Sequence, residues 1–387
     1  MNILRQTAAI TALNFRNLTQ RFWPSMVIVV GLAAAIAVLL SMMSVTQGIR
    51  QVYINSGDRM RAIIVTATAD GEGDSAITRD QAALITDAPG IAKGADGKPL
   101  ADRGLNMGIP VLRKDGSKGY TTMRGYGPMA QQVRPEFHII AGRMFRFGQR
   151  EMVVGEGARF LFQNMNIGDD VILPGGPWKI VGIFKAGDIT DGQVVGDTET
   201  MMPALHKTAY NSILVRLASY GSLDTLKRAL TTNPALSVKV ERHSDWYNRA
   251  AGNNSNFLAK LAYAIGAILA IGALFGCLNT MYSAVSSRGR EIATLRALGF
   301  SAIPVMVSVI LETLVLSIGG ALIGAAAAFL LYNGKQDFFG TNVFHLTVSP
   351  GLVALGIIWA AVVALLGGLP PSIRAARRPV VDALRAT

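Results

Sequence analysis

Four long stretches with almost no charged side chains dominate this 387-residue sequence. Three of them, 22–49, 261–287 and 346–373, contain no Asp, Glu, Lys or Arg, and a fourth, 301–332, contains a single acid, Glu312. A helix needs roughly 20 apolar residues to cross a bilayer core about 30 Å thick. Only 16% of the chain is charged, well below the share typical of soluble domains. We therefore expect four transmembrane helices, at residues 22–47, 257–286, 301–333 and 350–371.

Arginine residues flank these spans unevenly and predict the orientation of the chain. They precede the first span, separate the second from the third, and follow the fourth: Arg5, Arg16, Arg21, Arg288, Arg290, Arg296, Arg374, Arg377, Arg378 and Arg385. The loop at 334–349 carries only Lys335 and Asp337. Because short cytoplasmic loops are enriched in Lys and Arg, we expect both termini and residues 287–300 to be cytoplasmic. Residues 48–256 are then extracytoplasmic, as is the 334–349 loop.

The two ends of the chain have distinct patterns. Residues 1–21 mix apolar and polar side chains in a way that suits a cytoplasmic helix lying in the headgroup plane, with a frayed terminus as the alternative. Residues 372–387 form a basic cytoplasmic tail. The first apolar stretch is longer than the core of a signal peptide, and no small-x-small cleavage site follows it. We expect it to remain as a span of an inner-membrane protein.

Between the first two spans, the apolar residues shift toward a period of two, with turn residues between the runs. This pattern predicts a large α+β domain at 48–256, either undivided or built of two subdomains. Two hairpins and one strand–helix–strand unit are indicated. The hairpins pair 106–112 with 119–124 and 170–173 with 178–184, and the unit covers 211–217, 223–230 and 236–240.

One loop and four aromatic residues of this domain allow a functional interpretation. The segment 68–80 is rich in Gly and acids, and we expect a flexible, solvated loop there in preference to a calcium site at Asp70 and Asp74. Four phenylalanines suit core packing better than a cargo groove: Phe145, Phe147, Phe160 and Phe162.

The composition and motifs exclude several functions. The net charge is +12, but the basic clusters lie beside apolar runs and not in a stripe with aromatics, so we expect no nucleic-acid binding. The single cysteine, Cys277, permits no disulfide or thiolate metal site within the chain. His138, His206, His243 and His345 lack metal-ligand spacing. The nearest candidate for a phosphate loop, at 94–99, lacks the Walker spacing. We therefore expect no metal, cofactor or enzymatic activity in this chain.

The segment 287–300 carries the strongest functional signal. As a helix it has an apolar stripe with charges around it. A short amphipathic helix between two spans is suited to docking in a partner's groove, although an ordinary interfacial connector fits equally well. The stripe is Ile292, Leu295 and Leu298, and the flanking charges are Arg288, Glu291 and Arg296.

Residues 288–299 have the sequence Arg-Gly-Arg-Glu-Ile-Ala-Thr-Leu-Arg-Ala-Leu-Gly. This sequence closely resembles the cytoplasmic coupling segment of the MacB/FtsX/LolC family of ABC permeases. The tail at 367–385, with Gly-Gly-Leu-Pro-Pro at its start and Ala-Leu-Arg at its end, is similar to that family's C-terminal signature. Weaker similarity runs through 140–183. The resemblance covers nearly the whole chain, but no ATPase domain is evident in it.

The resemblance implies a fold of four transmembrane helices, arranged 1+3, with an α+β extracytoplasmic domain of the MacB periplasmic type. It implies two copies of the permease, a homodimer or a related pair, bound to a cytoplasmic ABC ATPase dimer that supplies ATP and magnesium. A periplasmic adaptor is a further possible partner, and membrane lipid surrounds the spans. The implied ATPase contact is made by Arg288, Glu291, Ile292, Leu295, Arg296 and Leu298.

Within the spans, one acid and two glycine pairs need an explanation. An intramembrane carboxylate is a functional candidate by default, but Glu312 lies where it can pair with a basic residue near the cytoplasmic side, and we interpret it as structural. Glycines four residues apart permit close helix approach. The pairs are Gly272 with Gly276 and Gly320 with Gly324, and they suit either a dimer seam or packing within one subunit.

Two functions compete. The first is ATP-driven export or extraction of an amphipathic substrate such as a lipid, lipoprotein, peptide or hydrophobic toxin. The second is a mechanical transmitter like FtsX, whose outer domain regulates a periplasmic cell-wall hydrolase. A secondary transporter is disfavoured, because one membrane acid leaves little for an ion-coupled site.

Overall fold

The computed structural model describes residues 6–7, 10–12, 22–173, 175–298, 300–339 and 342–377. Most of the N-terminal segment 1–21 and all of the tail beyond 377 therefore lie outside the described residues. The chain divides into two compact units. A helical unit comprises the described parts of 1–47, 256–335 and 346–387, and a sheet domain comprises 48–255 and 336–345.

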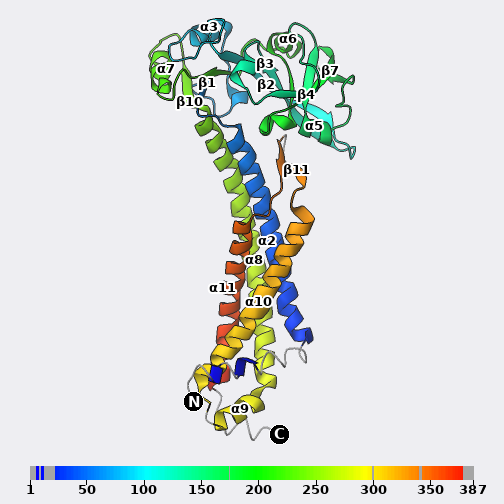
Figure 1. Cartoon of the computed structure of the whole chain (residues 1–387), viewed down its shortest axis with the longest axis vertical. Helices are drawn as coiled ribbons and strands as arrows, with labels where there is room; N and C mark the ends of the chain where they lie inside the picture. The colour runs from blue at the N-terminus through cyan, green and yellow to red at the C-terminus, as the bar shows by residue number, and fades with distance from the viewer. Residues whose placement is uncertain are drawn as a thin grey trace. The chain divides into compact units, whose positions relative to one another are not determined.

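Four helices of the described chain are long and apolar enough to cross a membrane, which confirms the prediction of four spans. They are α2 (Phe22–Ser56), α8 (His243–Ser287), α10 (Ala302–Tyr332) and α11 (Pro350–Arg377), and α9 (Gly289–Ala297) joins α8 to α10. In the helical unit the four long helices run alongside one another, and α9 lies at the end where α2 begins and α11 ends (Figure 1).

The helices extend beyond the uncharged stretches that predicted them. α2 was expected to end near residue 47 but continues to Ser56, and α8 begins at His243 although its apolar part starts near 257. Polar side chains do not end a helix, and Gln51 hydrogen-bonds Asn55 one turn later at 2.8 Å. The absence of charge therefore marks the apolar part of each helix but not its ends.

Glycines set how closely the long helices approach one another. A Cβ on Gly320 would lie 2.7 Å from the Val29 carbonyl oxygen, and one on Gly324 would lie 2.4 Å from that of Ala33. This glycine pair of α10 therefore packs against α2 within the chain, which decides one of the alternatives left open by the sequence. A Cβ added to Gly272 of α8, by contrast, would meet nothing within 4 Å among the described residues, and the same holds for Gly276.

The sheet domain contains a mixed ten-stranded sheet in the order β10-β1-β9-β2-β3-β8-β5-β7-β4, with β6 paired to β7. The strands are β1 (Arg61–Thr66), β2 (Ala101–Leu112), β3 (Lys118–Tyr126), β4 (His138–Gly142), β5 (Glu151–Gly155), β6 (Asp170–Leu173), β7 (Gly176–Lys185), β8 (Val194–Asp197), β9 (Ser212–Arg216) and β10 (Val238–Arg242). The long strand β2 pairs with β9 through 101–104 and with β3 through 105–112, so it joins the two halves of the sheet.

Short helices cover this sheet. They are α3 (Arg79–Thr86), α4 (Ala130–Val133), α5 (Glu156–Leu161), α6 (Thr198–Ala204) and α7 (Ser222–Thr231), with 3₁₀ turns η2 (Glu72–Asp74) and η3 (Ile189–Gly192). α7 packs on β10 and α6 on β2 and β3 (Figure 1). The largest apolar core lies beneath them and includes Ile64, Trp178 and Tyr210.

Both predicted hairpins are confirmed. β2 pairs antiparallel with β3, and β6 with β7. The strand–helix–strand prediction for 211–240 is confirmed as β9, α7 and β10. Of the four phenylalanines, Phe145 and Phe162 are buried in the core as expected, whereas Phe147 and Phe160 are exposed.

Two loop predictions need correction. The expected loop at 334–349 contains a hairpin, β11 (Gln336–Phe339) with β12 (Asn342–His345), which belongs to the sheet domain. The expected flexible loop at 68–80 is anchored at its centre, because the Glu72 carboxylate is buried and accepts a 2.8 Å bond from Arg124. Acid-rich loops look solvated in a sequence when the basic partner is distant along the chain.

Candidate functional site

Helix α9 presents two different faces. Ile292 is only 8% exposed and packs into an apolar cluster of the helical unit that includes Val285 and Val305. Its neighbour Ala293 is also buried. On the other side, Arg290, Glu291, Thr294, Ala297 and Leu298 are exposed. Spacings of three and four residues place side chains on one helix face, so these residues form one outward surface.

An ion pair anchors the start of α9 to α10. Arg288, the N-cap residue, donates to Glu312 from Nη1 at 2.8 Å and from Nη2 at 3.3 Å. Both side chains are 6% exposed. A guanidinium and a carboxylate in this two-bond arrangement fix each other's position as well as their charge. The structure thus provides Glu312 with the basic partner that its structural interpretation requires.

A second polar contact ties α9 to α11. Arg296 donates from Nη1 to the carbonyl oxygen of Ala376 at 2.8 Å. Helix α9 is therefore joined to α8 by the chain, to α10 by an ion pair and to α11 by this bond.

The structure divides the six residues that the sequence selected. Arg288 and Ile292 face the chain's own interior, and Arg296 is half-buried against α11. Glu291 and Leu298 face outward, Leu298 with 72% of its surface exposed. The side chain of Leu295 lies outside the described residues. Helical periodicity identifies an apolar stripe but not whether that stripe packs inward or on a partner, which is why the sequence grouped all six together.

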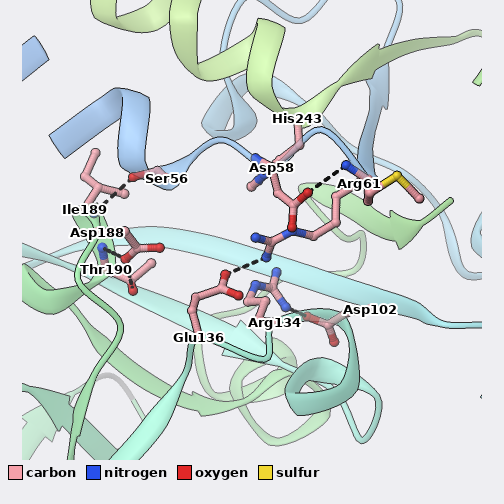
Figure 2. Close-up of polar contacts among 11 residues, drawn as sticks. Ser56, Asp58, Arg61, Asp102, Arg134, Glu136, Asp188, Ile189, Thr190 and His243 are labelled. Carbon is pink, nitrogen blue, oxygen red and sulfur yellow. Dashed lines mark hydrogen bonds and ion pairs between the residues drawn. The ribbon is translucent and has the colours of Figure 1, made fainter. Parts of the chain in front are cut away.

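Within the sheet domain, polar residues gather where α2 ends and α8 begins, and we call Ser56, Asp58, Arg61, Glu136 and His243 the junction cluster (Figure 2). Arg61 pairs with Asp58 through Nε at 3.0 Å and with Glu136 through Nη1 at 2.6 Å. The backbone N–H of Asp58 donates to Nδ1 of His243 at 3.2 Å. The first residue of α8 is thereby held to the segment that follows α2.

The junction cluster also contacts the η3 turn of the sheet domain. Ser56, the last residue of α2, accepts a bond from the backbone N–H of Ile189 at 3.0 Å, and Asp188 caps the η3 turn by accepting from Thr190 (Figure 2). Nearby, Arg134 pairs with the buried Asp102. The ends of both long helices therefore connect to the sheet through buried, directional contacts.

Burial changes the acid–base behaviour of this region. Burial first, and then the positive charges of Arg61 and Arg134, hold the pKa of His243 well below its ordinary value. Burial raises the pKa of Asp188, and it raises the pKa of Asp191 to about 6. The neutral imidazole of His243 is consistent with its role as an acceptor for the Asp58 N–H.

No sequence signal pointed to the junction cluster. Its members are scattered from residue 56 to residue 243, and none belongs to a motif. His243, one of the four histidines without metal-ligand spacing, is buried and hydrogen-bonded. In the described part of the chain, no three His, Cys, Asp or Glu residues gather in a metal-binding arrangement.

Comparison with protein families covers most of the chain. The model of the MacB-like periplasmic core domain matches residues 25–233, and that of the FtsX-like permease C-terminal domain matches 263–380. The chain belongs to the MacB/FtsX-like family of ABC transporter permeases. The family resemblance is thereby confirmed, as is the fold class of four apolar helices with a MacB-type domain.

Several relatives of this permease are named as export proteins. It is 25% identical to the macrolide export ATP-binding/permease protein MacB of Chlorobium luteolum, over 93% of this chain and 57% of that protein. It is 26% identical to the pyoverdine export protein PvdT of Pseudomonas syringae pv. tomato, over 56% of this chain and 34% of PvdT. The chain spans about half the length, or less, of such fused relatives.

Two further comparisons concern a relative named only as a permease and a solved structure. The ABC transporter permease YvrN of Bacillus subtilis is 26% identical over 54% of this chain and 55% of YvrN. The periplasmic region of MacB from Actinobacillus actinomycetemcomitans superposes with a TM-score of 0.39 and 15% identity, covering 52% of this chain and 96% of that region.

Proposed function

We propose that this permease couples ATP hydrolysis by a separate cytoplasmic ABC ATPase dimer to movement of the sheet domain on the opposite side of the inner membrane. The movement exports or extracts an amphipathic substrate. The observation that carries the proposal is the attachment of α9, which presents an outward face while an ion pair and a hydrogen bond fasten it to α10 and α11. Glu291 and Leu298 contact the ATPase in this account.

The same contacts supply a route for the motion. The ATPase displaces α9, and the buried Arg288–Glu312 pair carries the displacement into α10. Helix α8 is unbroken from Ser287 back to His243, which belongs to the junction cluster. Helix α2 is likewise unbroken as far as Ser56, which holds Ile189. A continuous helix transmits displacement along its axis because its backbone hydrogen bonds resist stretching.

The remaining parts of the proposal concern the substrate and the second copy. Relatives named for export of a macrolide and of pyoverdine support cargo of mixed polar and apolar character. A second copy of the permease packs along α8, where a Cβ on Gly272 or Gly276 would meet nothing within 4 Å among the described residues. Arginines at the α9 end of the helical unit support the cytoplasmic placement of that end.

Hydrogen–deuterium exchange tests the coupling. The permease is reconstituted in lipid nanodiscs with the ABC ATPase that co-purifies with it, and exchange is compared with and without an ATP analogue. We expect the analogue to change protection of the amides at 56–61 and 238–247, and we expect Leu298→Asp to abolish the change. Equal exchange in both states of the unaltered complex would contradict the proposal.

A further inference from the structure

The sheet domain contains a cavity of about 430 Å³ that no residue of the junction cluster lines. It lies beside the C-terminal end of α2 and the N-terminal end of α8. Residues of α2, η2, β2, β3, η3 and α8 line it. Its size falls in the range typical of small-molecule sites, roughly 300–1,000 Å³. All of its lining residues belong to 48–255, so it is complete within the sheet domain.

One side of the cavity is aromatic. Tyr53, Trp246 and Tyr247 line it, and the rings of Tyr53 and Tyr247 lie 6.3 Å apart at 52° to one another. Trp246 and Tyr247 are buried, with 6% and 8% of their surfaces exposed. Such rings offer a flat, apolar face at little cost in conformational entropy.

The rest of the lining contains polar groups that lack partners. Among the described residues, the hydroxyls of Thr122 and Tyr247 and the side chains of Asp70 and Asn253 make no hydrogen bond. Thr122 is only 9% exposed. Neither hydroxyl is among the buried polar atoms without a partner, so both remain accessible, and Asp70 and Asn253 are exposed. The lining therefore offers several accessible groups to a ligand that donates and accepts hydrogen bonds at several points.

The positive and negative charges of the residues that line the cavity cancel. Glu72 and Arg124 form the floor and satisfy each other, and although burial opposes it, the charge of Arg124 lowers the pKa of Glu72. The negative charge of Asp70 is offset by the positive charge of Arg249, whose ion-pair partner is Glu241. The face of Trp246 already has Arg249 at 4.9 Å and Lys239 at 5.5 Å from its ring centre. The aromatic side is therefore not an open cage for a cationic ligand.

We propose that this cavity binds a neutral sugar ring of a glycan. A pyranose ring has an apolar face of C–H groups, which stacks on aromatic rings, and a rim of hydroxyls, which both donate and accept hydrogen bonds. The rings of Tyr53 and Tyr247 match the first feature, and the unpartnered Thr122, Tyr247 and Asn253 match the second. A purely apolar ligand would leave those groups unsatisfied. The proposal goes beyond ATP coupling and does not depend on it.

The test uses the full chain in lipid nanodiscs prepared without glycoside detergents, and without ATPase or nucleotide. The probes are maltotriose, cellotriose and triacetylchitotriose, each followed by saturation-transfer NMR and by quenching of tryptophan fluorescence. We expect saturable binding of at least one probe. Thr122→Val, which replaces the hydroxyl by a methyl of similar size, is expected to weaken that binding about tenfold.

Two further variants keep the result interpretable. Asn253→Ala removes an exposed amide from the cavity and is not expected to disturb folding. Thr86→Val makes the same chemical change as Thr122→Val at an exposed helix position and should leave binding unaltered, because Thr86 does not line this cavity. The proposal is overturned if none of the three sugars binds saturably. It is also overturned if the folded Thr122→Val and Asn253→Ala proteins both bind as well as the unaltered chain.

Discussion

Arg288 and Glu312 are 24 residues apart in the sequence and meet in the interior of the helical unit. Removing two charges from water is expensive, so a buried pair of this kind does not by itself imply extra stability. Its effect is positional, because neither partner can move without leaving the other uncompensated. At the residue scale, the pair therefore explains how one acid within an apolar span is retained and how α9 is fastened to α10.

This pair predicts a non-additive mutant cycle. Arg288→Met or Glu312→Met alone leaves one buried charge unpaired and should destabilise the chain by about 3–5 kcal/mol. The double variant removes both charges and should recover most of that loss. Thermal unfolding of the three variants in nanodiscs measures the cycle. Losses that simply add in the double variant would show that the two side chains are energetically independent.

His243 predicts a dependence of stability on pH. Because its pKa in the folded chain lies well below the ordinary value near 6.5, the unfolded chain takes up a proton between these two values and the folded chain does not. The contribution of His243 to the free energy of unfolding is therefore fully present above pH 6.5 and is lost as the pH is lowered. The loss is at most about 1.4 kcal/mol per pH unit.

The variant His243→Asn isolates this contribution, since asparagine can still accept the Asp58 N–H but does not titrate. Melting temperatures at pH 7.5, 6.5 and 5.5 should fall less steeply for the variant than for the unaltered chain. The half-buried Asp188 and Asp191, whose raised pKa values give the opposite slope, are present in both proteins. Identical slopes would exclude His243 as the source.

At the scale of the elements, close packing and open surface alternate along the long helices. Gly367 of α11 lies against Cys277 of α8, where an added Cβ would be 2.8 Å from the sulfur, and Gly368 lies against Thr313 of α10. These contacts give a physical reason for the paired glycines at the start of the C-terminal signature. The Gly272 and Gly276 positions show no such contact among the described residues.

A matched pair of substitutions tests this difference. Gly324→Val places a side chain against the Ala33 carbonyl of α2 and should cost about 1–3 kcal/mol by overpacking. Gly272→Val meets nothing among the described residues of the chain and should leave its thermal stability unchanged. If α8 forms the seam between two copies, Gly272→Val will nevertheless reduce the dimer fraction measured by native mass spectrometry. A destabilised Gly272→Val monomer would contradict the assigned packing.

At the scale of the whole molecule, the sequence predicts what is local and misses what is distant. The absence of charge located α2, α8, α10 and α11, and turn residues located the hairpins, because both signals lie within a short window. The pairing of Arg61 with Glu136, 75 residues away, has no such signal. Neither does the contact of Glu72 with Arg124, which anchors a segment expected to be flexible.

In the candidate site, too, the sequence predicts local features and misses contacts between distant segments. The letters of 288–299 identified the helix and its family, but the inward position of Ile292 depends on packing against α8 and α10, which no periodicity reveals. The proposed ATPase contact therefore shifts from the whole stripe to its outward members, chiefly Glu291 and Leu298.

The most direct test measures the affinity of the co-purifying ABC ATPase for the nanodisc-bound permease and for two variants. Leu298→Asp adds a charge to the outward face of α9, and Leu112→Asp makes the same change at an exposed strand end of the sheet domain. We predict that Leu298→Asp weakens ATPase binding at least tenfold, while Leu112→Asp binds normally and both variants unfold at the temperature of the unaltered chain. Undiminished binding by Leu298→Asp would contradict the assignment of α9 as the coupling helix.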